Sequence, residues 1–122
     1  MKVEDVISRL ESLGLPYAEN EFRKTKEKPL PKPPYVIWYE DKAEAYGGDS
    51  ITLLKKRDIV IELYTDKKED KALERLIEHN IFHDVGYEKF QALLQSEDLV
   101  QTAYTFKVTE KLARAERTLT HG

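Results

Sequence analysis

The chain has 122 residues, of which 40% are hydrophobic and 35% charged, and its formal net charge is −3. This length and composition suit a single soluble domain with one core and argue against wholesale disorder. The absence of cysteine excludes disulfides, thiolate metal ligands and cysteine nucleophiles, and the acidic balance disfavours a protein whose main task is to hold duplex nucleic acid.

The N-terminal segment predicts an amphipathic helix rather than a targeting signal. It begins MKVEDVISRL, with acids where a secretory signal needs an apolar core, and no apolar run approaches the roughly 20 residues of a membrane span. We therefore expect a chain that is made in the cytoplasm and is not inserted into a membrane. The apolar residues at helical spacing are Val3, Val6, Ile7, Leu10 and Leu13. They predict a helix of about three turns that ends at Gly14.

A short edge strand is expected from Tyr17 to Phe22, and a basic, proline-rich loop follows it. The loop, residues 23–34, reads RKTKEKPLPKPP, and its prolines favour exposed, extended geometry. Its cations are Arg23, Lys24, Lys26, Lys28 and Lys32, against the single acid Glu27. Three roles are open for it: contact with nucleic acid, for which it lacks stacking aromatic residues, docking to a partner protein, or a solubilising connection.

Two longer strands are predicted next. The aromatic and β-branched run Tyr35–Tyr39 predicts a strand buried on both faces, and Gly47-Gly48-Asp49 predicts a turn. A second strand covers about Ile51–Tyr64. One of its faces is formed by Ile59, Ile61 and Leu63, and the other by Val60 and Tyr64. Its middle, Lys55-Lys56-Arg57-Asp58, interrupts the apolar pattern, which indicates either a β-bulge or a strand that projects beyond the core.

The second half of the chain predicts one helix and two further strands. Asp66 is the expected N-cap, with Glu69 completing a capping-box pattern, and Asn80 is the expected end of the helix. Strands are predicted at about 87–95 and 100–109, and one face of the latter is formed by Val100, Thr102, Tyr104, Phe106 and Val108. Residues 111–122 are expected to form a polar, flexible tail.

The order of these elements is α-β-β-β-α-β-β, with hairpins rather than regular crossovers. This order predicts an α+β fold, a mostly antiparallel four- to five-stranded sheet with two helices packed on one face. Residues 1–110 are expected to form this single domain.

Two clusters of polar residues are candidates for sites of chemistry. His79 and His83 are four residues apart and Asp84 follows, which is a possible metal-ligand spacing, but no third ligand is evident and polar residues around a helix end are the favoured explanation. Asp58 and Glu62 resemble the acidic pair of a metal-dependent nuclease, yet Tyr64 occupies the position where that pattern needs a lysine. Neither cluster predicts catalysis, and we expect no catalytic residue, cofactor or metal.

Several segments together resemble one protein family. The run IVIELYTDKK at residues 59–68 is preceded by PYVIWY at 34–39 and followed by YEK at 87–89, SEDL at 96–99 and the aromatic residues Tyr104 and Phe106. In this order the segments are similar to the tail-completion, or tail-terminator, proteins encoded by siphophages and prophages. The resemblance covers about residues 1–110.

The resemblance implies a non-catalytic structural protein of the virion, located in the neck region of the tail. Proteins of this family form a ring, typically a hexamer, at the end of the finished tail tube, where they stop polymerisation and present a surface for head joining. The implied partners are further copies of the chain, the tail-tube protein and the head connector or stopper protein, with no membrane and no specific nucleic acid.

A ring needs two different contact surfaces on each subunit, and basic residues are candidates for one of them. The candidate interface residues are Lys24, Lys26, Lys28, Lys32, Lys55, Lys56 and Arg57. The last three are equally well explained as a solvated strand face. Two other functions are kept as alternatives: a head–tail connector subunit, and a nucleic-acid-processing accessory protein in which Asp58 and Glu62 hold a divalent ion.

Overall fold

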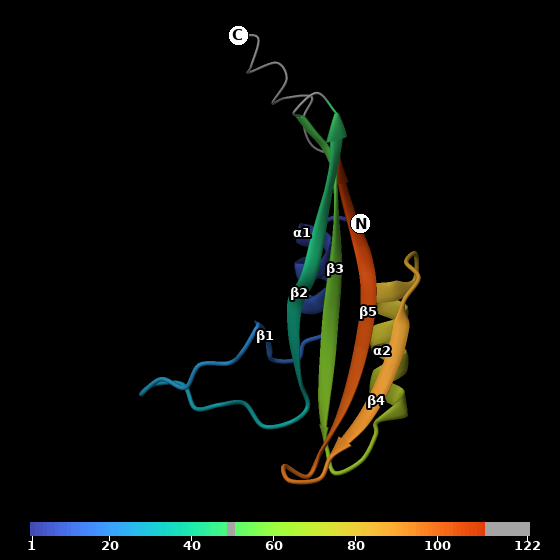
Figure 1. The fold of residues 1–122 in the computed structure, drawn as a ribbon. Helices are drawn as coiled ribbons and strands as arrows, with labels where there is room; N and C mark the ends of the chain where they lie inside the picture. The colour runs from blue at the N-terminus through green and yellow to red at the C-terminus, as the bar shows by residue number, and fades with distance from the viewer. Residues whose placement is uncertain (49–50, 112–122) are drawn as a thin grey trace.

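The described chain, residues 1–48 and 51–111 of a computed structural model, forms two layers (Figure 1). In chain order the elements are α1 (Val3–Glu11), β1 (Tyr17–Glu19), β2 (Tyr35–Gly48), β3 (Ile51–Asp66), α2 (Lys71–Phe82), β4 (Glu88–Leu94) and β5 (Leu99–Lys111). The strands form one five-stranded sheet in the order β1-β2-β3-β5-β4. Only β1 and β2 pair in parallel, while the other neighbours are antiparallel. Both helices cover the same face, so the predicted α+β fold and element order are confirmed.

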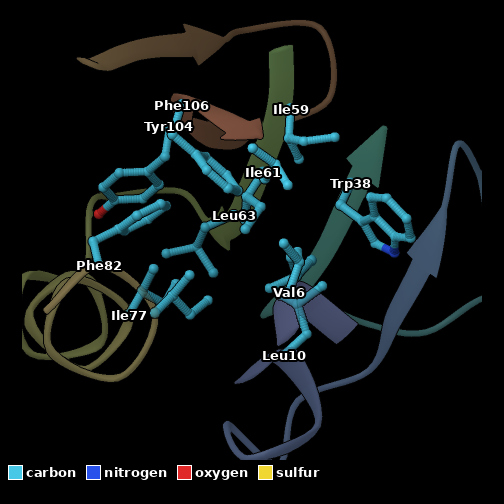
Figure 2. Packing of buried hydrophobic residues seen from close by; sticks show 13 residues of the cluster. Val6, Leu10, Trp38, Ile59, Ile61, Leu63, Ile77, Phe82, Tyr104 and Phe106 are labelled. Carbon is cyan, nitrogen blue, oxygen red and sulfur yellow. The ribbon is translucent and has the colours of Figure 1, made fainter. Parts of the chain in front are cut away.

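The core lies between the helices and one face of the sheet, and alternation along the strands supplies it. Ile59, Ile61 and Leu63 of β3 point toward the helices and are at most 1% exposed. Figure 2 shows them meeting apolar side chains of α1 and α2. The residues of β5 predicted to share one face, from Val100 to Val108, are all buried, as period-two alternation requires.

No helix within residues 1–48 and 51–111 covers the opposite face of the sheet. Tyr35, Ile37 and Tyr39 of β2 are only partly buried there, whereas their neighbours Val36 and Trp38 belong to the core. The prediction that this strand is buried on both faces is therefore wrong. Because both helices lie on one side of the sheet, every second residue of this apolar run enters the core. The residues between them form a partly exposed, largely aromatic surface on the other side.

The charged middle of β3 belongs to a projecting part of the sheet. β2, β3 and β5 continue past the helix layer at one end (Figure 1), and the pairing of β3 with β5 is unbroken from Leu54 to Asp66. The irregularity lies in the pairing with β2, where the register shifts between Glu40 and Lys42 and again between Tyr46 and Gly47. The sequence left two explanations for Lys55–Asp58, a β-bulge in this strand or a strand that projects beyond the core, and the structure shows the projection. Asp49 of the predicted turn lies outside the described residues.

Three predicted boundaries of helices are corrected. α1 ends at Glu11 with Ser12 as C-cap, before Gly14, which has a φ of +72°. Asp66 remains in β3, paired with Leu99, and the N-cap of α2 is Asp70, whose carboxylate accepts a hydrogen bond from the Leu73 amide at 3.0 Å. The sheet ladder holds Asp66 extended, so the cap forms at the later acid.

α2 continues past Asn80 to Phe82, because Ile81 and Phe82 are buried and their burial extends the helix by a further half turn. At the other end of the chain, β5 runs through Lys111, one residue beyond the predicted domain boundary. The rest of the predicted tail, residues 112–122, lies outside the described residues.

The two helices are joined by an ion pair between Arg9 and Asp84. Arg9 Nη1 lies 2.7 Å from Asp84 Oδ1, and its Nη2 lies 3.0 Å from Oδ2. Arg9 Nη1 also donates to the Ile81 carbonyl oxygen at 2.8 Å, at the C-terminal end of α2. The hydrogen bond from Arg9 is the main reason that the pKa of Asp84 falls to about 2.

Replacing Asp84 with asparagine is expected to lower the melting temperature at neutral pH but not near pH 2. The folded-state pKa of Asp84 is depressed, so its stabilising effect is present above the ordinary carboxyl pKa and is lost as pH falls toward 2. Melting curves of the wild type and the Asp84→Asn variant between pH 2 and 7 test this. A difference that is the same at every pH would contradict it.

Candidate assembly surfaces

The basic loop between β1 and β2 extends away from the sheet (Figure 1), and its lysines are exposed. Its base is anchored by Phe22, whose ring packs edge-on against Tyr35 with 5.4 Å between centroids. A tight turn closes its tip, where the Lys28 amide donates to the Thr25 hydroxyl at 2.9 Å. Within residues 1–48 and 51–111, none of its four candidate lysines forms an ion pair. These are Lys24, Lys26, Lys28 and Lys32.

The three other candidate interface residues lie at the opposite end of the sheet. Lys55, Lys56 and Arg57 pair with the far part of β2, whereas the loop enters β2 at its start. Eight residues of strand separate Lys56 from Tyr64, which pairs with Tyr35, and this corresponds to roughly 26 Å. The seven predicted residues therefore form two separate groups.

Arg57 and Asp58 are the centres of two ion-pair triads on opposite faces of the projecting strands. Arg57 lies between Glu40 of β2 and Glu110 of β5, with N–O distances of 3.0 and 3.3 Å. Asp58 lies between Lys107 of β5 and Lys42 of β2, with corresponding distances of 3.0 and 3.8 Å. The charges that interrupt the apolar pattern thus join β3 to both neighbouring strands.

The triads show which candidate cations already have acidic partners in their own chain. Arg57 has two acidic partners within its own chain, so it is already neutralised by its own subunit. Lys56 lies over the ring of Tyr46, 5.5 Å from its centroid, and Lys55 has no ion pair within the part of the chain that the structure describes. Lys55 and Lys56 remain available to an acidic surface on another molecule.

The carboxylates that were weighed as metal ligands do not converge. Asp58 is held by its two lysines, whereas Glu62 accepts hydrogen bonds from the hydroxyls of Tyr39 at 3.2 Å and Tyr64 at 2.8 Å. Among residues 1–48 and 51–111 there is no group of three or more histidine or acidic side chains arranged to hold a metal ion. In the same ranges, no helix combines the length and apolar character needed to cross a membrane.

The uncovered face of the sheet carries an aromatic and polar network that the sequence reading missed. Tyr35 and Tyr64 stack with ring centroids 5.1 Å apart, and the Tyr64 hydroxyl accepts a hydrogen bond from Gln101 at 3.0 Å. Burial, followed by the hydrogen bond to Glu62, raises the pKa of Tyr64. The signal that marks this face is the alternation of tyrosines at positions 35 and 39.

A second missed feature joins α2 to the edge strand β4. The Lys89 ammonium lies 2.6 Å from Oε1 of Glu74 and 2.8 Å from Oε2 of Glu78. The hydroxyls of Tyr104 and Tyr87 donate to Glu78 at 2.8 and 3.1 Å. We call these five residues the Lys89 cluster. It holds β4 to the helix layer from the inner face of the sheet.

Burial and charge oppose each other in the Lys89 cluster. Burial alone would raise the pKa of Glu78, but the hydrogen bonds from Lys89 and the two tyrosines outweigh it and hold that pKa below its usual value. Glu74 is only 1% exposed, and its Oε2 receives no hydrogen bond from any described residue. Burial of the charged Glu74 carboxylate is therefore stabilised by the nearby Lys89 ammonium.

Comparisons with known proteins add no family to this description. No protein-family model matches the chain, and a search of curated proteins found no match.

Proposed function

We propose that this chain is a non-catalytic structural subunit of a phage tail, a tail terminator that forms a ring on the end of the tail tube. The ring ends tube polymerisation and presents the surface for head joining. The segments that resemble the family are strands and turns of the sheet, so the proposal concerns the shape of the subunit rather than a pocket.

The observation that carries the proposal is the uncovered sheet face together with the outward-reaching basic loop. In a two-layer domain the helices cover one face of the sheet and the other face meets solvent. Here that second face carries aromatic side chains, which suits it to contact with another molecule. The loop supplies four lysines without an ion pair among the described residues at one end of the sheet, and at the other end Lys56 lies on the uncovered face and Lys55 on the helix side. Subunits that bind neighbours on two sides and a tube on a third need such separate surfaces.

The geometry of the acidic residues favours this structural role over metal-dependent chemistry on nucleic acid. Asp58 and Glu62 each have partners from their own chain, and their side chains are held by different groups. A divalent ion at Asp58 would have to displace Lys107, whose pKa is raised chiefly by its hydrogen bond to that carboxylate. The exposed lysines therefore fit an acidic protein surface better than a catalytic phosphate site.

The test is termination of tail tubes assembled from tail-tube protein. Adding the chain is expected to stop elongation and to place a ring on tube ends, seen by negative-stain electron microscopy and by size-exclusion chromatography with light scattering. Tubes that elongate unchanged at high concentrations of the chain would overturn the proposal. Antibody labelling at the connector side alone would instead indicate a head–tail connector subunit.

A charge-reversal variant locates the contact. Changing Lys24, Lys26, Lys28 and Lys32 to glutamate is expected to weaken tube binding by about tenfold, because four rim ion pairs of about 0.3–0.5 kcal/mol each sum to about 1.2–2 kcal/mol. A control changes Lys67 and Lys68, exposed cations in the turn after β3, to glutamate, which is half the charge change of the loop variant, and it should bind as the wild type does. Equal loss in both variants would mean that net charge, rather than the loop, governs binding.

A further inference from the structure

The sheet ends on one side at β4, whose outer edge lacks the usual protection of an edge strand. Native proteins guard such edges with lysines, prolines or bulges that prevent pairing with other chains. The segment Phe90–Leu94 contains no charge, proline or bulge, and Phe90 and Leu93 are 65% and 55% exposed. Lys89, the one lysine of the strand, is turned inward to Glu74 and Glu78. This edge is therefore ready to accept a further strand.

The other side of the sheet offers a second, different edge. β1 covers β2 only from Val36 to Trp38, and the Asn20 amide ends that contact by donating to the Trp38 carbonyl at 2.8 Å. From residue 39 to residue 46, no described strand lies on the outer side of β2. The free stretch of β2, YEDKAEAY, has eight residues to the seven of β4. It contains Lys42 and the register shift between Glu40 and Lys42, so the two edges differ in chemistry as well as in direction.

Strand direction makes these two edges complementary. Three successive antiparallel pairings, β2 with β3, β3 with β5 and β5 with β4, leave β2 and β4 running in opposite directions. A second copy placed beside the first in the same orientation therefore brings its β2 antiparallel to β4. Antiparallel pairing of this kind would continue the sheet from one subunit to the next without a break.

We propose that β4 of each copy pairs with residues 39–46 of β2 in the next copy, and that this pairing is the seam of the ring. The inference rests on the proposed function, since it takes the two sheet edges as the surfaces by which neighbouring subunits of the ring bind each other. Because the two edges are different, the contact is heterologous, and it closes into a ring when the rotation per subunit divides a full turn.

The seam requires neighbouring copies to be displaced along the strands. Glu88, the first residue of β4, is level with Tyr39 through the pairings Glu88–Thr105, Thr105–Val60 and Val60–Tyr39. The free part of β2 begins at that level and runs away from β4, so the next copy must move by about seven residues, or roughly 23 Å. With four strands about 4.8 Å apart in each subunit, a displacement of this size requires a tilt of about 50° from the ring axis, slightly steeper than the roughly 35–45° of ordinary β-barrels.

A hollow at the start of β4 fits the end of the incoming strand. β4 begins at Glu88, whereas β5 continues to Lys111 with no described strand on that side. A cavity of about 510 Å³ lies there, between the segment that leads into β4 and the exposed side of β5. Tyr87, Phe106 and Val85 give it apolar walls. In the proposed seam, Tyr46 of the next copy, which is 45% exposed, lies beside this hollow.

Engineered cysteines test the seam directly, because the chain has none of its own. Gln91 of β4 and both Ala43 and Ala45 of β2 lie on the helix side of the sheet. Combining Gln91→Cys with Ala43→Cys, or with Ala45→Cys, should give a ladder of oxidised oligomers on tube ends. Gln91→Cys alone should give none. Disulfide dimers of that single variant would show that two β4 strands pair, and would overturn the proposal.

A charge on the edge gives a second readout that needs no disulfide. Phe90→Lys is expected to reduce self-association by at least tenfold, whereas Leu76→Lys, at a 41% exposed position on α2 rather than on a sheet edge, should leave it unchanged. Tube termination without cross-links from either cysteine pair overturns the seam and leaves the tail-terminator function standing. A cross-linked ladder without tube termination supports the seam and removes the proposed function.

Discussion

Replacing Lys89 with methionine is expected to lower the free energy of unfolding by about 3 kcal/mol, the lower end of the cost of removing one partner from a buried ion pair. Lys89 is the nearest cation to the Glu74 carboxylate, which is 1% exposed. Without it, the one cation left near Glu74 among the described residues is Lys71, 3.7 Å away and largely in solvent. Urea denaturation of the wild type and the variant measures the difference.

Two further variants separate the ion pair from loss of packing. Lys71→Met removes the exposed cation near the same carboxylate and should cost less than about 0.5 kcal/mol, as exposed ion pairs do. Adding Glu74→Gln to Lys89→Met should recover most of the loss, because the buried charge is then gone. No recovery in the double variant would indicate that the aliphatic part of Lys89, rather than its charge, stabilises the fold.

Replacing Phe82 with alanine is expected to cost about 3–5 kcal/mol, the usual penalty for a large-to-small change in a packed core. Phe82 is 5% exposed, and its ring centroid lies 5.2 Å from that of Tyr104, 4.9 Å from that of Phe106 and 4.7 Å from that of Tyr87. It therefore joins the end of α2 to β5 and to the segment that leads into β4.

The matched control lies on the same helix. Leu76 is 41% exposed, so Leu76→Ala should cost less than about 1 kcal/mol. Thermal and chemical denaturation compare the two variants. A loss at Phe82 no greater than that at Leu76 would mean that the aromatic group does not connect these elements, and that α2 is held chiefly by Ile77 and Ile81.

Features that depend on local periodicity were predicted from the sequence. The alternation in β3 and β5 places Ile61 and Tyr104 in the core, because a strand has only two faces and the apolar residues of each occupy one. The charged middle of β3 was also informative, since it marked the part of the strand beyond the helices. The exposure of the lysines in residues 23–34 was predicted from the prolines and charges of that segment, which favour an extended loop in solvent.

Features that depend on competition between local signals were not predicted. Asp66 and Asp70 are both acceptable helix caps, and the sequence alone favoured the first. Pairing of Asp66 with Leu99 in the sheet left Asp70 as the cap. In the same way, Asn80 is a plausible helix end only until the burial of Phe82 is counted.

The amino-acid sequence by itself determined the element order, the core face of the central strands and the chemical character of the basic loop, because these follow from short-range patterns. The tertiary structure alone decided which strands became edges, which sheet face stayed uncovered, and which carboxylates Lys89 and Arg57 neutralise. These depend on contacts between segments far apart in the chain, such as the ion pair between Arg9 and Asp84, which are 75 residues apart. The surfaces available for assembly are a property of that long-range packing.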